Sequence, residues 1–196
     1  MKPSQKIVES TLAPHKNTLN SIVLDAWEEW KGSSERMRCR FPRTGRSIMF
    51  ERLVDRALAE FSSISGIKPI EGHETIHFLF ADQVLVRFKY AGRSRISSNV
   101  NTQLSLSFHD HENQLTLFPD FHKVDLIYQL DLSQTEISDI RVVARQGDKL
   151  LWDYSIFEAQ ESDSVLEMPI EPDQPRDTKR LVKVKGNQQE TGDQRK

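Results

Sequence analysis

The sequence has almost no cysteine and no long apolar run. Cys39 is the single cysteine, so no disulfide can form within the chain and a cysteine-rich zinc site is excluded. No apolar run approaches the roughly 18 residues that a membrane-spanning helix needs. The opening MKPSQKIVES also lacks the apolar stretch of a signal peptide. We therefore expect a cytoplasmic protein that does not enter the membrane.

A strong charge of one sign is missing as well. The formal net charge is −2, so no overall field draws the chain to nucleic acid or to a membrane surface. Hydrophobic residues make up 37% and charged residues 29%, which is polar for a compact domain and indicates that part of the chain does not pack. We expect a flexible N-terminus at residues 1–15, a single domain at 16–159 and a disordered polar tail at 160–196.

Two hydrophobic periodicities divide the expected domain. Apolar residues at helical spacing predict amphipathic helices at about residues 16–31 and 47–63. The period then changes to two, which predicts strands at 66–72, 73–82, 83–91, 124–131, 139–146 and 149–156. Pro69 lacks an amide donor and marks an edge strand, and Gly147-Asp148 predicts a tight turn. The expected fold is α+β, with two N-terminal helices packed on one face of a five- or six-stranded, mainly antiparallel sheet.

Alternation along these strands gathers charges on the face opposite the helices. These charges are Arg87, Lys89, Arg141, Arg145, Asp125 and Asp153. One interpretation is cross-strand ion pairing on a solvated face, worth about 0.2–1 kcal/mol per pair. The other is a surface that binds an anion or a protein, because single aliphatic residues lie among the charges. In the last strand, alternation predicts Leu150 toward the helices and Leu151 away from them.

A second group of cations lies in the expected loop SSERMRCRFPRTGR, residues 33–46. It contains Arg36, Arg38, Arg40, Arg43 and Arg46 around Phe41, and Arg93 and Arg95 follow the predicted hairpin. Such arginines can contact phosphates. No helix-turn-helix, RRM or zinc-finger pattern accompanies them. An acidic segment of a protein partner, or the protein's own acidic tail, is therefore an equal alternative to nucleic acid.

No catalytic constellation emerges from the sequence. The run FHDHE (108–112) lacks the ligand spacing of a zinc site, so we expect no metal and no cofactor. The PD-(D/E)xK nuclease motif requires an acid two residues before Lys89, where Arg87 stands. No base can be paired with Cys39 from the sequence. An enzymatic role is therefore the less favoured interpretation.

One part of the chain resembles a known group of proteins. It contains RSIMFERLVDRALAEF (46–61), FLFADQVLVRFKYAG (78–92), TQLSLSF (102–108), VDLIYQLD (124–131) and VARQGDKLLWDYSI (143–156). In order and texture these segments resemble uncharacterised bacterial and phage proteins encoded beside helix-turn-helix repressors and ImmA/IrrE-type metallopeptidase-like proteins. Those neighbourhoods are similar to the toxin–antitoxin modules described as Rosmer systems.

The resemblance implies a toxin-like or effector component of a toxin–antitoxin-like or prophage locus. Such a protein would act through protein–protein interaction with a repressor-like or antitoxin-like partner. The alternative is a nucleic-acid-binding or nucleic-acid-processing protein that uses a basic surface. The residues expected to bind are the six charges on the face opposite the helices together with Arg38, Arg40, Arg43, Arg93 and Arg95.

Overall fold

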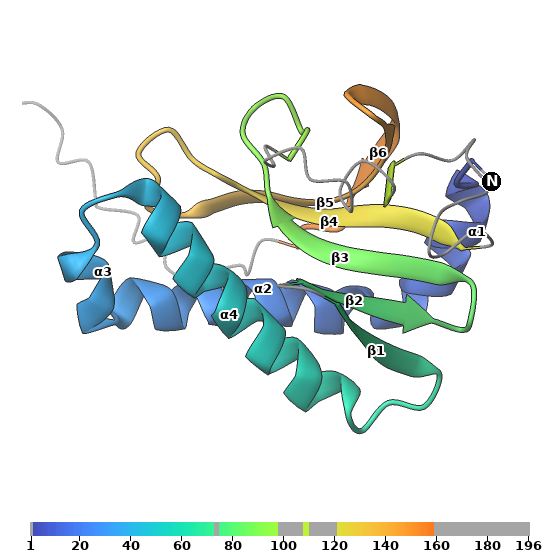
Figure 1. The fold of residues 1–196 in the computed structure, drawn as a ribbon, viewed down its shortest axis with the longest axis horizontal. Helices are drawn as coiled ribbons and strands as arrows, with labels where there is room; N and C mark the ends of the chain where they lie inside the picture. Colours follow the sequence, from blue (N-terminus) through green and yellow to red (C-terminus); the bar gives the residue numbers. More distant parts are fainter. Residues whose placement is uncertain (1, 73–74, 98–107, 110–120, 159–196) are drawn as a thin grey trace, which may run out of the picture. The chain divides into compact units, whose positions relative to one another are not determined.

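A computed structural model describes residues 2–72, 75–97, 108–109 and 121–158. The named elements within these ranges are four α-helices and the six strands of one sheet. The helices are α1 (Gln5–Leu12), α2 (Lys16–Gly32), α3 (Ser34–Arg38) and α4 (Pro42–Phe61), and a 3-10 turn (Ala13–His15) joins α1 to α2. The strands are β1 (Ile67–Gly72), β2 (Thr75–Phe80), β3 (Val84–Tyr90), β4 (His122–Leu130), β5 (Ile137–Gln146) and β6 (Lys149–Ser155) (Figure 1).

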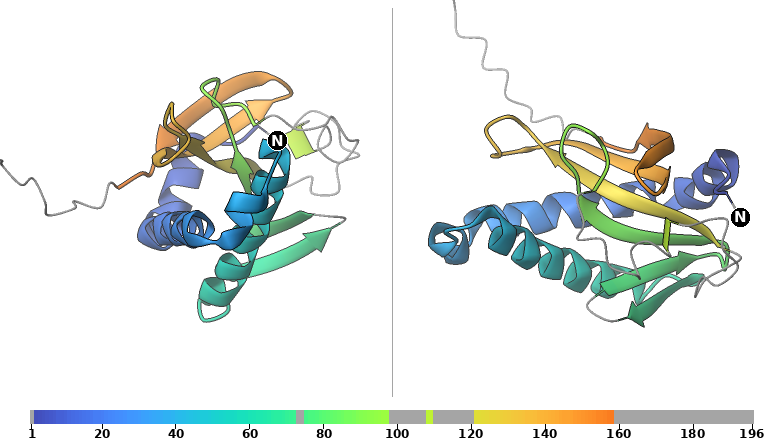
Figure 2. Two further views of the ribbon diagram at one scale, coloured as in Figure 1. Left: turned by 90° about the vertical axis from the view of Figure 1, so that its left-hand side faces the viewer. Right: turned by 45° about the horizontal axis from the view of Figure 1, so that its top comes forward.

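The strands follow the chain order β1-β2-β3-β4-β5-β6 across the sheet. Neighbouring strands are antiparallel except β3 and β4, which run parallel. A parallel pair needs a crossover connection, here residues 91–121. The strand β1, which contains Pro69, forms one edge as predicted. The expected α+β fold, with helices on one face of a mainly antiparallel sheet, is confirmed (Figures 1 and 2).

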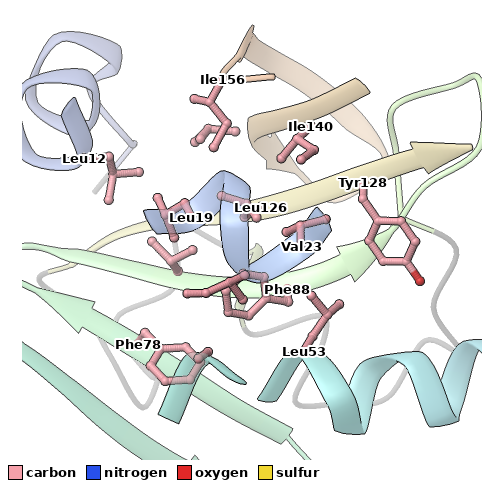
Figure 3. Packing of buried hydrophobic residues seen from close by; sticks show 14 of the residues in the cluster. Leu12, Leu19, Val23, Leu53, Phe78, Phe88, Leu126, Tyr128, Ile140 and Ile156 are labelled. Atoms are coloured by element: carbon pink, nitrogen blue, oxygen red, sulfur yellow. The ribbon is translucent and has the colours of Figure 1, made fainter. Parts of the chain in front are cut away.

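The helix-covered side of the sheet, called the inner face here, holds the main hydrophobic core. Figure 3 shows side chains of α2, α4 and the strands gathered in one cluster, among them Leu19, Val23, Leu53, Phe78, Phe88, Leu126 and Ile140. Phe61 of α4 meets Phe78 and Phe80 edge-on, with ring centroids 5.1 and 5.5 Å apart. Strand alternation predicts a set of inward residues in β2 to β5, and all of them lie in this core or pack against it: Phe78, Phe80, Val84, Val86, Phe88, Val124, Leu126, Tyr128, Leu130, Ile140, Val142 and Ala144. Burial of these large apolar side chains is the main force that holds the helices to the sheet.

The helix α2 matches its predicted range, but α4 begins earlier than predicted. Pro42 occupies the first position of α4, after Phe41 in an extended conformation. Proline suits this position because its fixed φ is helical and it has no amide proton to leave without a partner. The expected basic loop at 33–46 therefore contains the short helix α3 and the first turn of α4.

A glycine lets α4 approach α2 closely. A Cβ atom at Gly45 would lie 3.0 Å from the Trp30 ring, which is too near for an ordinary contact. Arg52 of α4 also pairs with Glu35 of α3 at 2.8 Å, and Arg56 pairs with Glu29 of α2 at 3.2 Å. These contacts hold α3 and the start of α4 beside the end of α2.

The expectation of a flexible N-terminus at residues 1–15 is wrong for most of that range. Residues Gln5–Leu12 form α1, and Val8 and Leu12 are 0% and 2% exposed. The carbonyl of Pro3 also accepts a hydrogen bond from the Trp152 indole at 2.9 Å. Two apolar residues four apart are too few to establish a helical period in a sequence, yet they suffice to anchor one short helix in the core.

The turn between β5 and β6 confirms one prediction and corrects another. Gly147 has φ +56°, the left-handed conformation that favours glycine in a tight turn. Beside it, Arg145 pairs with Leu150 and Ala144 pairs with Trp152, so Leu151 is one residue too many in the ladder. This β-bulge reverses the alternation, and Leu150 packs on the outer face while Leu151 packs against the inner core.

The described residues end at residue 158, and the expected tail at 160–196 lies outside them. Residues 110–112 of the FHDHE run also lie outside them. Within the described ranges, no helix combines the length and the apolar character needed to cross a membrane.

Candidate functional site

The sheet face opposite the helices, called the outer face here, carries a buried cluster of charges. Arg87 of β3 lies beside Asp125 of β4 in the parallel ladder, and Arg145 comes from β5. The three residues are 4%, 1% and 5% exposed, respectively. Cross-strand ion pairing on this face is therefore present, but the expectation that the pairs are solvated is wrong.

Asp125 is the centre of this cluster. Arg87 Nε donates to its Oδ1, while Arg87 Nη2 and Arg145 Nε each lie 3.4 Å from Oδ2. The hydroxyl of Ser97 donates to Oδ2 at 3.3 Å. Burial alone would raise the pKa of Asp125, but the charge of Arg87, a hydrogen bond from it and the charge of Arg145 hold the pKa well below its ordinary value. Asp125 is therefore ionised in the folded protein at neutral pH.

His109 completes the cluster. Its Nε2 is contacted by Arg87 Nη2 and by Arg145 Nε, the latter at 2.9 Å. A guanidinium group can only donate, so Nε2 accepts both bonds and carries no proton. The neighbouring Phe108 ring lies 4.2 Å below the Arg87 guanidinium and stacks on His77 of β2 at 5.1 Å. Burial, followed by the charge of Arg87, lowers the pKa of His77 to about 4.

The described residues of the crossover at 91–121 explain why this face is buried. Ser97 and His109 bind the charged cluster, while Phe108 and Phe121 pack with Leu79 and Leu85. The ion-paired residues of three strands therefore hold the crossover onto the sheet. Arg87, Asp125 and Arg145 are satisfied inside the protein, so they are not placed to meet a partner.

A second group of outer-face charges lies farther toward the sheet edge and closer to solvent. Arg141 donates to Asp153 and, at 2.6 Å, to Asp139. Arg95 reaches Asp153 at 3.4 Å. The Arg141 and Asp153 side chains are 16% and 10% exposed, whereas Arg95 is 47% exposed. The predicted residues Arg141, Asp153 and Arg95 are thus brought together, but mainly with one another.

The arginines of residues 33–46 form two groups, one that stacks on aromatic rings and one that is exposed to solvent. Arg36 and Arg46 lie over the rings of Trp27 and Tyr90, at 5.8 and 4.1 Å. By contrast Arg38, Arg40 and Arg43 are exposed and form no ion pair within the described part of the chain. Two apolar side chains accompany them, Met37 at 89% and Phe41 at 65% exposure. We call Met37, Arg38, Arg40, Phe41 and Arg43 the α3–α4 patch.

A groove opens beside this patch, between β2 and β3 and under α4. The β2–β3 ladder ends at the pair Phe78–Val86, and the strands then diverge (Figure 1). The resulting groove has a volume of about 950 Å³. Arg43, Arg46, Phe50 and Glu51 of α4 line one side, and Glu71, Ile76, Phe88, Lys89 and Tyr90 line the strand side. We call this cavity the β2–β3 groove.

Lys89 lies in the groove rather than in the buried cluster. Its ammonium nitrogen is 5.8 Å from the Phe50 ring of α4. Burial, followed by the nearby charge of Arg87, lowers the pKa of Lys89. No carboxylate of the described residues lies within ion-pair distance of it. Among the described residues, Lys89 is therefore a half-buried cation without a counter-ion. The remaining predicted residue, Arg93, is exposed in the loop after β3.

Sequence reasoning missed Ser97 and His109 of the buried cluster and the whole β2–β3 groove. His109 is part of FHDHE, but its role depends on arginines 22 and 36 residues away. The groove has no sequence signal, because it follows from an early end of one strand ladder. Among the described residues, no group of three or more metal-binding side chains lies close enough together to hold an ion.

Comparison with known proteins adds no relative. No family model matches the chain, and neither a curated protein nor a solved structure matches it significantly.

Proposed function

We propose that this protein acts in the cytoplasm by binding a protein partner through the α3–α4 patch. The exposure of Met37 and Phe41 among arginines carries the proposal. Methionine, phenylalanine and arginine are enriched at protein interfaces, where an exposed apolar side chain gains contact area and an arginine gains an acceptor. The other large exposed apolar side chains of the described residues, Ile7 and Leu132, lie in separate parts of the chain.

The same proposal includes a biological setting. The resemblance of residues 46–156 to proteins of Rosmer-like modules supports a toxin-like or effector component of a toxin–antitoxin-like or prophage locus. The partner is then the repressor-like or antitoxin-like product of a neighbouring gene. Arg87, Asp125 and Arg145 are buried, which argues against a binding site on the outer face. The α3–α4 patch, by contrast, is an accessible basic surface, and this difference supports the proposal.

Co-expression of this chain with the products of its neighbouring genes, followed by pull-down, tests the proposal. We expect one product to be retained, and we expect the double variant Met37→Ser/Phe41→Ser to weaken retention by about tenfold or more. Leu132→Ser is the matched control, since Leu132 is 82% exposed but lies in the β4–β5 loop. Failure of every neighbouring product to associate, or equal retention by the double variant, would contradict the proposal.

A growth assay tests the toxin-like role separately. Expression of this chain alone is expected to slow growth of a bacterial host, and co-expression of the retained partner is expected to relieve the effect. Harmless expression of soluble protein would remove the toxin-like role while leaving the interaction in place.

Nucleic-acid binding is the second candidate, favoured by the three exposed arginines of the patch. A gel-shift titration with DNA and RNA at several salt concentrations distinguishes it from a protein partner. The variant Arg38→Gln/Arg40→Gln/Arg43→Gln is the decisive comparison. A shift that weakens steeply with salt and is lost in this variant would favour the second candidate, and no shift at low salt would exclude it.

A further inference from the structure

We propose that the β2–β3 groove binds an extended segment of the partner, which adds a short strand to the open edge of β3 and places an acidic side chain beside Lys89. This inference rests on the proposed function and names the chemistry of the bound segment. Three observations support it, namely the direction of the backbone groups of β3, the charges that line the groove, and its apolar walls.

The backbone of β3 presents hydrogen-bonding groups to the groove. The amide of Ala91 donates to Tyr128 of β4 at 3.1 Å, and the carbonyl of Gln83 accepts from His122 at 2.9 Å. Because successive residues of a strand direct these groups to opposite sides, Phe88 and Tyr90 direct theirs away from β4, toward the groove. The described part of β2 pairs with β3 only up to Val86. Within the described part of the chain, Phe88 and Tyr90 thus form an open strand edge to which an extended segment can add.

The charges that line the groove favour an acidic segment. Lys89 is half-buried and has no carboxylate within ion-pair distance among the described residues, while Arg43 and Arg46 lie at the groove surface. The acids of the lining, Glu51 and Glu71, are both exposed and therefore hydrated. A half-buried cation gains most from a partner when burial has removed water and no acceptor replaces it, as holds for Lys89 among the described residues.

Apolar side chains supply the other part of the lining. The groove is lined by acidic and basic residues and also by six apolar residues, Phe50, Leu53, Val54, Leu58, Ile76 and Phe88. An extended segment projects alternate side chains to opposite sides. Alternating apolar and acidic residues would therefore place the apolar side chains against α4 and the acids toward Lys89. A nucleic-acid strand matches this lining less well, since Glu51 and Glu71 would repel its phosphates.

Selection of peptides from a displayed library of random octapeptides, with the full chain as target, tests the inference. We expect the enriched peptides to alternate apolar residues with Asp or Glu. One enriched peptide, synthesised with a fluorescent label, then serves as the probe for anisotropy titrations. Replacement of its acids by Asn or Gln is expected to weaken binding by about tenfold, as expected for the loss of a charge-assisted contact.

Substitutions at two positions that line the groove test whether the probe binds there. Lys89→Glu is expected to weaken binding by about tenfold or more, with Lys89→Met as a charge-neutral second variant. Ser47→Trp adds bulk to an exposed lining position and is expected to abolish binding. Lys149→Glu is the matched control, because Lys149 is an exposed lysine of β6 that lies outside both the groove lining and the α3–α4 patch. Thermal unfolding of each variant checks that it is folded.

Backbone amide exchange, measured by NMR with and without the probe, tests strand addition directly. Protection of the Phe88 and Tyr90 amides by the peptide supports the inference. No enriched peptide, equal binding by folded Ser47→Trp, or protection elsewhere overturns it. The two proposals fail separately: a neighbouring protein that is retained by groove variants but lost by Met37→Ser/Phe41→Ser would overturn the groove inference alone. Peptide binding in the groove without any retained neighbouring protein would instead contradict the α3–α4 patch proposal.

Discussion

The two faces of the sheet are both buried, but by different chemistry. The inner face is covered by helices and holds almost only apolar side chains. The outer face contains smaller apolar clusters around a carboxylate, two guanidinium groups and an imidazole. Adjacent residues of β4 illustrate the contrast, since Leu126 is 1% exposed on the inner face and Asp125 is 1% exposed on the outer face.

This difference determines how each face responds to change. An apolar core loses stability in proportion to the atoms removed and to the cavity left behind. A buried ionic cluster contributes little net stability when complete, because desolvation offsets attraction, but loss of one member leaves a buried charge without its partner. Substitutions on the inner face should therefore lower the stability gradually, according to the atoms removed. On the outer face, loss of any one charged residue of the buried cluster should lower the stability sharply.

The largest expected effect comes from Asp125→Ala. It leaves Arg87 and Arg145 facing each other without a counter-ion, and we expect a loss of about 3–5 kcal/mol in the free energy of unfolding. Leu126→Ala, one residue along the same strand, should cost about 2–5 kcal/mol through lost burial. Urea denaturation measures both. A loss below about 1 kcal/mol for Asp125→Ala would contradict the ionic account of the outer face.

A combined replacement separates the two mechanisms. Arg87→Met, Asp125→Leu, Arg145→Met and His109→Leu together remove all the charges and fill a similar volume. We expect this variant to be more stable than Asp125→Ala and to lie within about 1 kcal/mol of the wild type. If it is as unstable as Asp125→Ala, the hydrogen-bond geometry itself, rather than an isolated charge, stabilises this face.

The next effect is a pH dependence that arises from His77. In the unfolded chain this histidine titrates near its ordinary pKa of 6.5, whereas in the folded protein the pKa is about 4. Above pH 6.5 both states are neutral at this site and it contributes no slope. As the pH falls from 6.5 to 4, only the unfolded state takes up the proton, so the folded state should lose about 3 kcal/mol.

His77→Phe is the control for this prediction. It keeps an aromatic ring to stack on Phe108 and cannot titrate. Urea denaturation of both proteins at several pH values should show a difference in stability that changes between pH 6.5 and 4 and is constant above that range. Parallel curves for the two proteins would show that His77 is protonated equally in both states.

The smallest expected effect is that of Asp153→Ala. Asp153 accepts from Arg141 and Arg95 on the same outer face, but Arg141 keeps Asp139 as a partner and Arg95 is half-exposed. We expect a loss of about 1 kcal/mol, which shrinks at high salt because solvent reaches this group. A loss as large as that of Asp125→Ala would show that the sheet edge is as dependent on its charges as the buried cluster.

Much of the fold could be predicted from hydrophobic periodicity. The change from a helical to an alternating period located α2, the body of α4 and all six strands, and alternation assigned the inner residues of β2 to β5 correctly. The misses have local causes. The helix α1 has too few turns to show a period, Pro42 extends α4 into a basic stretch, and one bulge exchanges the faces of Leu150 and Leu151.

The candidate site was predicted only in part. Strand alternation alone placed Arg87, Asp125 and Arg145 on one face, and they do lie together. It also assigned Lys89 to them, although the diverging strands turn this side chain into the groove. Arg36 and Arg46 stack on Trp27 and Tyr90, whereas the arginines of the α3–α4 patch are exposed. This difference depends on how α3 and α4 pack, and residue spacing along the chain does not show it.

The amino-acid sequence by itself determined the elements, the faces of the strands and the side of the sheet that the helices cover, because these depend on neighbouring residues and their period. Tertiary structure decided whether each face meets water. The parallel pairing of β3 and β4 requires a crossover, and its described residues lie over Arg87, Asp125 and Arg145. The early end of the β2–β3 ladder likewise opens the groove beside Lys89. Both features depend on contacts between distant segments, so the strand patterns that identify the charged residues cannot show which of them are accessible.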